Sequence, residues 1–285
     1  MHTTPVIDVH VHIQPWKQFN PAALALMRRD PEHFALMKRL CDDPRAFLEH
    51  LDREGVQAAG LVNYVAPEVM GLQDSVCEFV VAYCKADPQR LLPIGSLHPH
   101  STPHVAQRMD ELIEMGIRAF KLHPPHQCLY PNAYRNGDDN VRVVYEKCEQ
   151  HGLPVMIHTG TSVFPGARNV YADPIYLDDV AVDFPRLTLL MAHGGRPLWM
   201  ETAFFLLRRH SNLWLDLSGI PPRRLLDYFP RFESLADRAL FGTDWPGPGV
   251  PSMRGNVRQF LALPLSDETK RKVLHDNAAK LFGLR

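Results

Sequence analysis

The sequence predicts a (β/α)₈ barrel, and three observations support this fold class. Short apolar runs rich in β-branched residues recur along the 285 residues, and each ends in polar residues. Segments with the apolar spacing of a helix lie between most of these runs. Eight parallel strands joined by helical crossovers close a sheet without open edges in about 250 residues. We therefore expect one barrel domain over residues 1–285.

Eight runs have the form of a buried strand with a polar carboxyl end. They cover residues 6–12, 58–65, 91–98, 117–123, 154–159, 187–193, 213–218 and 239–244. The carboxyl ends of the strands in such a barrel meet at one mouth. Polar residues that are scattered along the sequence should therefore lie together there.

Helical periodicity fills most of the connections. The predicted helices cover residues 105–115, 141–150, 178–184, 201–209 and 267–282. The first connection, residues 14–53, is much longer than the others, and we expect this insertion to form helices over the barrel mouth, with a merely longer crossover as the alternative. The Pro/Gly-rich segment 245–255 is too short and too rigid for an interdomain linker and is predicted to be the loop after the last strand.

Charge and composition exclude several classes of protein. The 31 Lys+Arg and 32 Asp+Glu give a net charge of −1, which argues against a nucleic-acid or polybasic membrane binder. No apolar run approaches the roughly 18 residues of a membrane span, and no signal-type start is present, so we expect a cytoplasmic protein. The five cysteines form no C-x-x-C pair, which favours reduced thiols over disulfides or a structural zinc site.

Residue types that bind metals are concentrated at the expected strand ends. A single histidine is more often a surface or hydrogen-bonded core residue, but this concentration reverses that expectation. The polar residues at the strand ends are His10, His12, Asn63, His98, Lys121, His123, His158, His193, Asp216, Ser218 and Asp244.

His10 and His12 are two residues apart on a strand, so both imidazoles should point into the barrel. Two unpaired polar rings in an apolar interior would cost several kcal/mol, and a shared cation would remove that cost. With His158 and Asp244 the set offers three nitrogens and one oxygen. This mixture suits zinc, or another first-row divalent ion such as manganese, with an open position for water.

The sequence also resembles a known family over nearly its whole length. The motifs IDVHVHIQP, AFKLHP, VMIHTGT, LWLDLSG, LFGTDWP and DNAAKLFGL are similar to those of the amidohydrolase superfamily, in the amidohydrolase-related branch that includes aminocarboxymuconate-semialdehyde decarboxylase and predicted metal-dependent hydrolases. The resemblance implies that His10, His12, His158 and Asp244 are metal ligands. It further implies that His193 is a catalytic residue beside the metal-bound water, that the barrel is distorted and that homodimers are frequent.

Two of these residues have roles that follow from their chemistry. Asp244 can accept a proton from the water and pass it to the leaving group, whereas the alternative is a residue that caps a turn. His193 can stabilise a developing oxyanion or orient the water, and the alternative is a metal ligand.

Lys121 allows two interpretations. Superfamily members with two metals carry a carbamylated lysine on this strand, and His123 follows close behind. An unmodified Lys121 would instead repel a second cation and bind a substrate carboxylate. We prefer one metal ion per chain, with Lys121 and His123 in the substrate site.

Three further residues are assigned to a substrate that we expect to be small and anionic. Arg168 and Arg196 could bind an anionic group through the fork of the guanidinium, although surface ion pairs are the commoner fate of arginine. Trp245 follows Asp244 directly and could form an apolar wall, or it could pack the loop.

These features predict a metal-dependent hydrolase of an amide, lactone or ester-like bond. The alternative is a non-oxidative decarboxylase of an aromatic or dienoic acid, which would use the same ligands. A barrel nuclease is less favoured, because Lys121 stands where such enzymes have a glutamate and the charge balance offers no basic face. A non-catalytic scaffold and a dinucleotide-dependent oxidoreductase are the remaining alternatives, and the second lacks a G-x-G-x-x-G motif.

Overall fold

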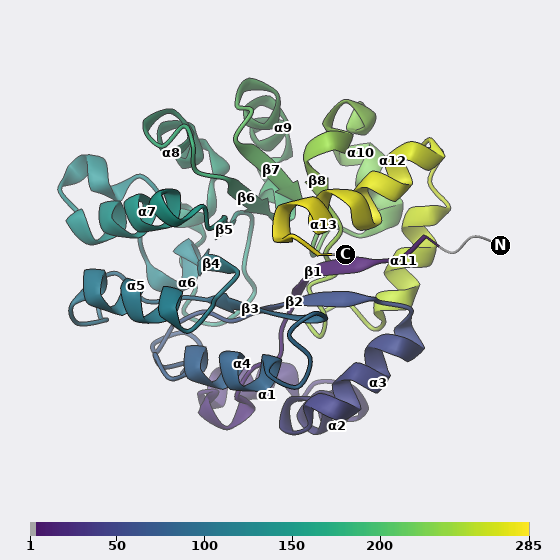
Figure 1. The fold of residues 1–285 in the computed structure, drawn as a ribbon, viewed down its shortest axis with the longest axis horizontal. Helices are drawn as coiled ribbons and strands as arrows, with labels where there is room; N and C mark the ends of the chain where they lie inside the picture. Colours follow the sequence, from purple (N-terminus) through teal and green to yellow (C-terminus); the bar gives the residue numbers. More distant parts are fainter. Residues whose placement is uncertain (1–3, 285) are drawn as a thin grey trace.

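Eight parallel strands form one sheet in chain order in the computed structural model, which describes residues 4–284. They are β1 (Ile7–Val11), β2 (Ala58–Val62), β3 (Leu91–Gly95), β4 (Ala119–Leu122), β5 (Val155–His158), β6 (Leu189–Ala192), β7 (Leu213–Asp216) and β8 (Ala239–Leu240). Figure 1 shows the strands around the centre and the helices outside them. Each strand lies inside the run predicted for it, so the predicted (β/α)₈ barrel is confirmed.

The helices occupy the connections. They are α1 (Pro21–Met27), α2 (Pro31–Asp42), α3 (Pro44–Glu54), α4 (Val76–Cys84), α5 (Val105–Glu114), α6 (Pro124–Gln127), α7 (Asp139–His151), α8 (Leu177–Asp183), α9 (Met200–Arg209), α10 (Leu225–Tyr228), α11 (Met253–Leu261), α12 (Asp267–Arg271) and α13 (Asn277–Phe282). The last predicted helix, 267–282, is divided because the π turn η8 (Lys272–Asp276) separates α12 from α13.

Short 3₁₀ turns complete the connections. They are η1 (Trp16–Gln18), η2 (Ala133–Asn136), η3 (Asn169–Ala172), η4 (Pro174–Tyr176), η5 (His193–Gly195), η6 (Pro222–Arg224) and η7 (Phe232–Arg238). Of these, η5 begins with His193, directly after β6, and η3 lies in the long connection after β5.

The barrel closes between β1 and the segment that follows β8. Although β8 itself is short, the chain continues beside β1 through backbone hydrogen bonds. These bonds join Val9 N–H to Phe241 O (3.0 Å), Asp244 N–H to His10 O (2.9 Å) and His12 N–H to Trp245 O (2.7 Å). Closure therefore brings Asp244 next to both histidines of β1.

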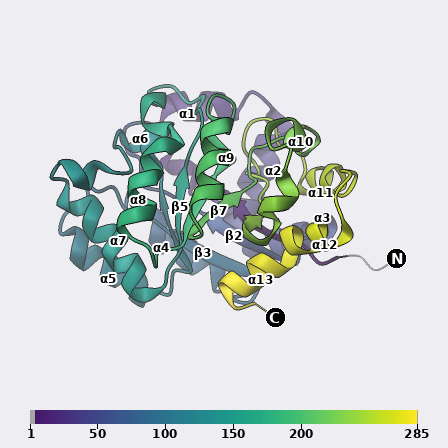
Figure 2. The ribbon, with the colours of Figure 1, turned by 90° about the horizontal axis from the view of Figure 1, so that it is seen from above.

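Inward-facing positions change from apolar to polar along the strands. Ala119 and Met156 belong to the inner apolar cluster, and two residues further along β4 and β5 come the buried Lys121 and His158. The same apolar cluster contains Phe282 of α13, which lies across the centre of the barrel in Figure 1. Figure 2 shows α1 and α6 at the end opposite α13, so one end of the barrel is filled and the other carries polar groups.

The insertion after β1 forms η1 and three helices, α1 to α3. Each of the three begins with an Asn or Asp whose side chain accepts a hydrogen bond from the first turn, followed by proline at the first helical position. Met27 at the end of α1 and Met37 in α2 line the pocket at the barrel mouth. The insertion thus contributes apolar wall to that pocket.

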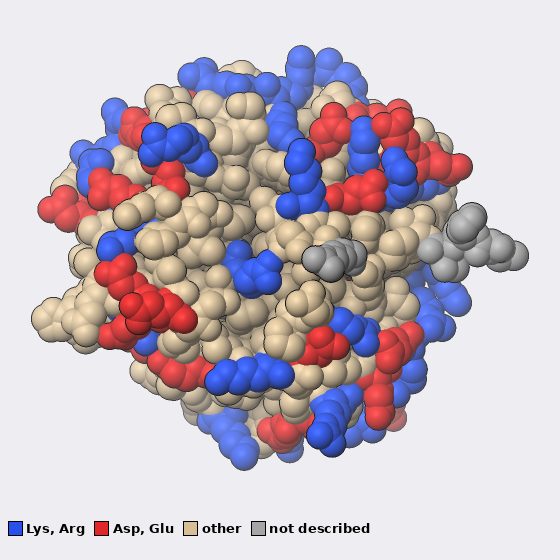
Figure 3. Space-filling model, viewed as in Figure 1, with Lys and Arg blue, Asp and Glu red and all other residues tan. Residues whose placement is uncertain are grey.

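Basic and acidic side chains are interspersed on the face seen in Figure 3, so neither positive nor negative charge dominates there. Within residues 4–284, no helix combines the length and apolar character that crossing a membrane demands. All five cysteines lie in the described part of the chain and have free thiols, and only Cys128 among them is exposed.

Candidate metal and substrate site

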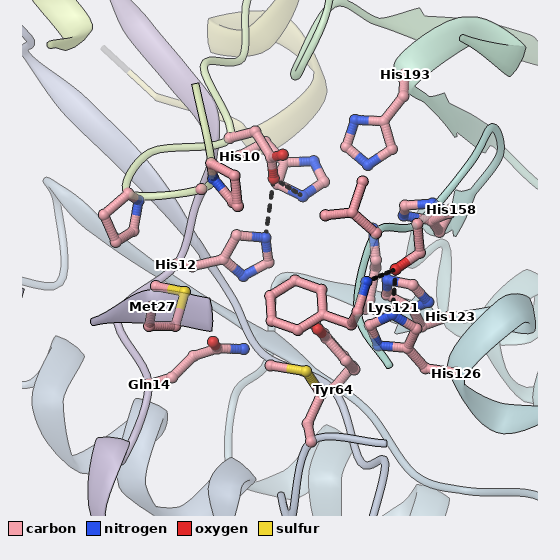
Figure 4. Close-up of a pocket in the computed structure, with 18 of the residues that line it drawn as sticks. His10, His12, Gln14, Met27, Tyr64, Lys121, His123, His126, His158 and His193 are labelled. Atoms are coloured by element: carbon pink, nitrogen blue, oxygen red, sulfur yellow. Dashed lines mark hydrogen bonds and ion pairs between the residues drawn. The ribbon is translucent and has the colours of Figure 1, made fainter. Parts of the chain in front are cut away.

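A pocket opens at the carboxyl ends of the strands. Its lining combines a polar floor with an apolar rim, and it takes in residues from most of the strand ends and from the insertion. The lining residues are His10, His12, Gln14, Met27, Met37, Tyr64, Met70, Lys121, His123, His126, His158, Thr161, Ser162, Val163, Phe164, His193, Arg196, Asp244, Pro246, Gly247 and Pro248. Figure 4 shows the histidines spread around this pocket, with His123, His126 and His158 next to Lys121 and His10 and His12 on the other side.

His10 is fully buried and held by a carboxylate. Its Nδ1 lies 2.6 Å from Asp216 Oδ2 at the end of β7. Burial raises the pKa of Asp216, but the neighbouring His10 lowers it by more, so the pKa lies below its ordinary value. The carboxylate is therefore ionised and can only accept a hydrogen bond. His10 Nδ1 therefore carries the proton, and Nε2 has a free lone pair with no hydrogen-bond partner among residues 4–284.

His12 and Asp244 face each other across the same space. His12 Nδ1 lies 2.9 Å from the carbonyl oxygen of Val62, which can only accept, so this nitrogen is the protonated one. His12 Nε2 then points at Asp244 Oδ1 at 3.0 Å, and His10 Nε2 lies 3.6 Å from the same oxygen (Figure 4). Lone pairs facing at this distance repel one another, so a second proton on His12 or a shared cation is required.

His193 brings a third nitrogen to this oxygen. Its Nδ1 donates to the carbonyl oxygen of Ser218 at 2.8 Å, which leaves Nε2 unprotonated in the neutral ring. Burial lowers the pKa of His193 to about 3. A neutral ring in this tautomer offers a lone pair at Nε2, which suits a metal ligand or a hydrogen-bond acceptor, and the catalytic role implied for His193 stays a prediction.

His193 and Asp244 both have left-handed backbone conformations, with φ of 68° and 69°. Such a conformation costs about 1–3 kcal/mol in a residue other than glycine and is concentrated at functional sites. The turns are held by hydrogen bonds from Arg196 N–H to His193 O (3.0 Å) and from Gly247 N–H to Asp244 O (2.7 Å). These two side chains are therefore directed into the pocket by backbone conformations that lower the stability of the fold.

The tightest group of ligand atoms consists of His10, His193 and Asp244, whose donor atoms all lie within 4.8 Å of one another. His12 flanks this group through its contact with Asp244 Oδ1. His158 lines the same pocket, and its Nε2 lies 3.1 Å from the carbonyl oxygen of Gly160, so Nδ1 is the nitrogen of this ring with a free lone pair. In this arrangement the third imidazole of the group is His193, and the ligand role implied for His158 stays a prediction.

The residues present fit a divalent cation. His10 and His193 each offer an Nε2 without a proton beside the ionised Asp244 carboxylate, and His12 Nε2 lies 3.0 Å from the same carboxylate. The buried Nε2 of His10 is left without a partner in the described chain. Burial raises the pKa of Asp244, but the hydrogen bond with His12 and the neighbouring histidines outweigh burial and lower it. Imidazole nitrogen and carboxylate oxygen are ligands that zinc and manganese accept, and the Asp216–His10 contact is the usual support for such a ligand.

Lys121 is the cation of the pocket floor. It is fully buried, and its Nζ has no hydrogen-bond partner among the described residues. Burial lowers the pKa of Lys121 to about 8, while the charges of Asp216 and Asp244 act in the opposite direction. A buried ammonium group without a partner is costly, so an anionic group bound beside it would recover that cost.

Three imidazoles form a stack beside Lys121. The ring centroids of His123 and His126 are 3.7 Å apart, and those of His123 and His158 are 4.0 Å apart, with interplanar angles of 22° in both pairs. Burial lowers the pKa of each of the three rings, to about 3 for His126. The stack is therefore a neutral, rigid wall, and it places His123 in the pocket as predicted.

The two predicted arginines are placed differently. Arg196 lines the pocket, and its buried Nε has no partner in the described part of the chain. Arg168 is exposed and is not among the pocket residues, and its backbone N–H donates to Pro125 O at 2.8 Å. The sequence could not separate them, because both follow strand ends and only the path of the loop decides which side chain turns inward.

Trp245 does not wall the pocket, which corrects the sequence-based assignment. It is fully buried, with its ring centroid 5.2 Å from that of His50 and 6.4 Å from that of Phe47, whose ring it stacks on. Its neighbour Pro246 lines the pocket instead. The reason is the turn at Asp244, which directs the following side chain toward α3 and away from the barrel mouth.

Replacing Trp245 by alanine should therefore lower the free energy of unfolding by about 3–5 kcal/mol, as expected for a large aromatic removed from a core. Chemical denaturation would measure the loss. Trp16→Ala is the matched control, since Trp16 is only partly buried and should cost less. A loss below about 1 kcal/mol for Trp245→Ala would contradict this placement.

Several pocket residues were not assigned a role from the sequence. Gln14, Tyr64, His126 and Ser162 all line the pocket. Each follows a strand end by a few residues, which is the signal that was available. His126 lies in α6, directly after β4, and Ser162 lies in the loop after β5.

Comparisons with known proteins agree with this fold. A sequence model of a family described as Amidohydrolase matches residues 7–284. An uncharacterised TIM-barrel protein from Bordetella bronchiseptica shares 24% identity with a TM-score of 0.78, and the alignment covers 98% of each chain.

Two further solved structures are of proteins named for an enzymatic activity. A dihydroxybenzoic acid decarboxylase from Polaromonas sp. JS666, with bound manganese and the inhibitor 2-nitroresorcinol, is 17% identical with a TM-score of 0.74 over 99% of this chain and 97% of that chain. A probable 2-pyrone-4,6-dicarboxylic acid hydrolase from Acinetobacter baumannii, with citric acid bound, is 18% identical with a TM-score of 0.68 over 98% and 99%. At these identities the solved structures support the fold alone. The family assignment rests on the sequence model, which matches residues 7–284. This chain belongs to the amidohydrolase family.

Proposed function

We propose that the protein is a metal-dependent hydrolase that cleaves an amide, lactone or ester-like bond in a small anionic organic molecule. The observation that supports it most directly is the convergence of His10, His12 and His193 on the ionised Asp244 carboxylate. His10, His12, His193 and Asp244 would hold the ion, with His158 as the further ligand implied by the family resemblance. We propose zinc, with manganese as the alternative, at one ion per chain.

A bound divalent cation lowers the pKa of a coordinated water from about 15.7 to about 7, which supplies hydroxide at neutral pH. Asp244 is the proton acceptor, because it is ionised and lines the pocket where that water would lie. Asp244 then returns the proton to the leaving group as the scissile bond breaks. His12, whose Nε2 lies 3.0 Å from Asp244 Oδ1, fixes the orientation of the carboxylate.

Lys121 and Arg196 bind the anionic part of the substrate. Both reach the pocket, and each has a buried nitrogen without a partner in residues 4–284. A pocket with two such cationic groups favours a carboxylate over a neutral group. The citric acid in the Acinetobacter hydrolase and the dihydroxybenzoate in a related decarboxylase structure are small anions of this kind, which supports the proposed substrate class.

The charge of Lys121 makes this binding pH-dependent. The pKa of Lys121 in the folded protein, about 8, lies below its ordinary value of 10.5, so the ammonium form is lost as the pH rises through about 8. A bound metal cation shifts that loss to lower pH. We expect kcat/KM for an anionic substrate to fall as the pH rises through this range, measured as a pH–rate profile.

Lys121→Met should lower kcat/KM at neutral pH by about 10- to 100-fold, the loss expected for a hydrogen bond to a charged group. It should also remove the alkaline fall. An unchanged alkaline limb in Lys121→Met would show that another group titrates there. Lys147→Met is the matched control, because Lys147 pairs with Asp110 on the outer helices.

The second candidate function is non-oxidative decarboxylation of an aromatic or dienoic acid. It is favoured by the solved structures of similar fold, several of which are decarboxylases of hydroxylated aromatic acids. In that reaction the bond to the carboxylate carbon breaks, its electron pair stays on the ring carbon, and a proton is delivered there. Asp244 is again the residue placed to handle the proton.

A substrate panel separates the two functions. Purified enzyme reconstituted with zinc or with manganese would be assayed against lactones, amides and esters that carry a carboxylate, and against hydroxybenzoates including 2,6-dihydroxybenzoate. Metal-dependent hydrolysis without carbon dioxide release supports our first proposal. Carbon dioxide release with no turnover of lactones or amides would replace it with decarboxylation.

A further inference from the structure

The pocket contains a polar pair that the proposed hydrolysis does not use. Ser162, in the loop after β5, lines the pocket, and its Oγ lies 2.7 Å from His126 Nε2. The backbone N–H of Phe164 donates to the same oxygen at 3.3 Å. Figure 4 draws the hydrogen bond at His126 beside the stacked rings.

Counting hydrogens at this oxygen shows where the hydroxyl points. A serine hydroxyl has one donor and two acceptor positions. If His126 Nε2 is protonated, it donates to Oγ, and Phe164 N–H occupies the second acceptor position. The hydroxyl hydrogen then has no acceptor among the described residues, and the open direction is the pocket.

The opposite tautomer is less favourable. If Ser162 donated to Nε2, the proton of His126 would lie on Nδ1, which is buried and has no partner in the described chain. A buried donor without an acceptor costs more than an under-used acceptor. A charged His126 is excluded as well, because burial and the nearby Lys121 lower the pKa of His126 to about 3.

The loop that carries Ser162 is held in place. Asn169 accepts a hydrogen bond from Ser162 N–H at 2.8 Å through Oδ1 and donates to Ser162 O at 3.3 Å through Nδ2. His126 is fixed by its stack on His123, with ring centroids 3.7 Å apart. The backbone of Ser162 and the imidazole beside its hydroxyl are therefore both held in place before any ligand arrives.

We propose that Ser162 is a substrate-binding residue whose hydroxyl donates a hydrogen bond to a carbonyl or carboxylate oxygen, with His126 and Asn169 as positioning residues. The proposal deepens the proposed function and rests on it for the chemical class of the substrate. A donor fixed in this way selects ligands that place an acceptor oxygen at the loop after β5, in addition to the anion held by Lys121 and Arg196.

The first test compares two ligands that differ in one acceptor group. Benzoate and isophthalate would be titrated calorimetrically into manganese-loaded enzyme. The wild-type protein should bind isophthalate about 10- to 100-fold more tightly than benzoate, and Ser162→Ala should reduce that ratio to about twofold. Ser234→Ala, at an exposed residue of η7, should leave the ratio unchanged. No preference in the wild type, or a full preference in Ser162→Ala, would overturn the proposal.

The second test addresses His126 as a positioning residue. His126→Phe keeps a ring to stack on His123 but removes the donor, and it should lower the isophthalate preference by about tenfold. His126→Gln, which can donate from its amide, should restore most of it. Nitrogen NMR of the imidazole gives an independent readout, because the proposal requires the proton of His126 on Nε2. A proton on Nδ1 in the ligand-free protein would overturn the assignment of the hydroxyl.

The outcome of these tests does not depend on whether the protein is a hydrolase. The NMR and calorimetric readouts need no turnover, so they decide the role of Ser162 even if the substrate panel rejects hydrolysis. For any substrate that the panel identifies with an acceptor oxygen at this position, Ser162→Ala should raise KM and leave kcat within about twofold.

Discussion

Asp244→Asn is expected to lower kcat/KM by about 10²- to 10⁴-fold, the range for loss of a general base. The amide cannot accept the proton that the carboxylate takes, and it also removes the anionic member of the His10, His193 and Asp244 group. Loss of a ligand adds to loss of the base, so the upper end of the range is expected. Steady-state kinetics on the substrate identified by the panel would measure it.

The control for this variant is Asp237→Asn. Asp237 is exposed over 81% of its side chain and pairs with Lys272 at 2.8 Å on the surface. It should retain wild-type activity, since exposed ion pairs contribute about 0–1 kcal/mol to stability and this one lies on the outer surface. Circular dichroism would check that both variants are folded. Full activity in folded Asp244→Asn would reject both the proposed base and the proposed ion site.

Removal of the divalent ion should abolish activity and leave the barrel folded. The barrel is closed by backbone hydrogen bonds and filled by an apolar core that does not involve the ion site. Dialysis against a chelator followed by elemental analysis would establish the metal-free state, and added zinc or manganese should restore turnover. The matched variant His10→Gln should lose the ion during purification, whereas His104→Gln, outside the pocket lining, should keep it.

The number of metal ions bound per chain after reconstitution tests whether the site holds one ion or two. One equivalent per chain is expected, because the free ammonium of Lys121 repels a second cation. Two equivalents, with a carbamate on Lys121 in the mass spectrum, would overturn the single-ion proposal. Active enzyme that contains no metal and is indifferent to chelators would contradict the metal-dependent mechanism as a whole.

The order of strands and much of the polar site could be predicted from the sequence. The run 6–12 places His10 and His12 at the end of a strand, and the run 239–244 ends at Asp244. This works because a buried strand must be apolar and short, and because parallel strands in a barrel put their carboxyl ends together. The division of the last helix by η8 was not predictable, since 267–282 has helical periodicity throughout.

What the sequence by itself determined was which residues arrive at the barrel mouth, because strand periodicity and family motifs are local properties of the chain. The tertiary structure decided what each side chain does there. It turned Trp245 into the core and Arg168 to the surface. It also set the hydrogen-bond partners of His193 and His158, which decide where their lone pairs point. The physical reason is that a carbonyl accepting from one ring nitrogen fixes the tautomer of that ring, and those carbonyls come from loops whose paths only packing determines.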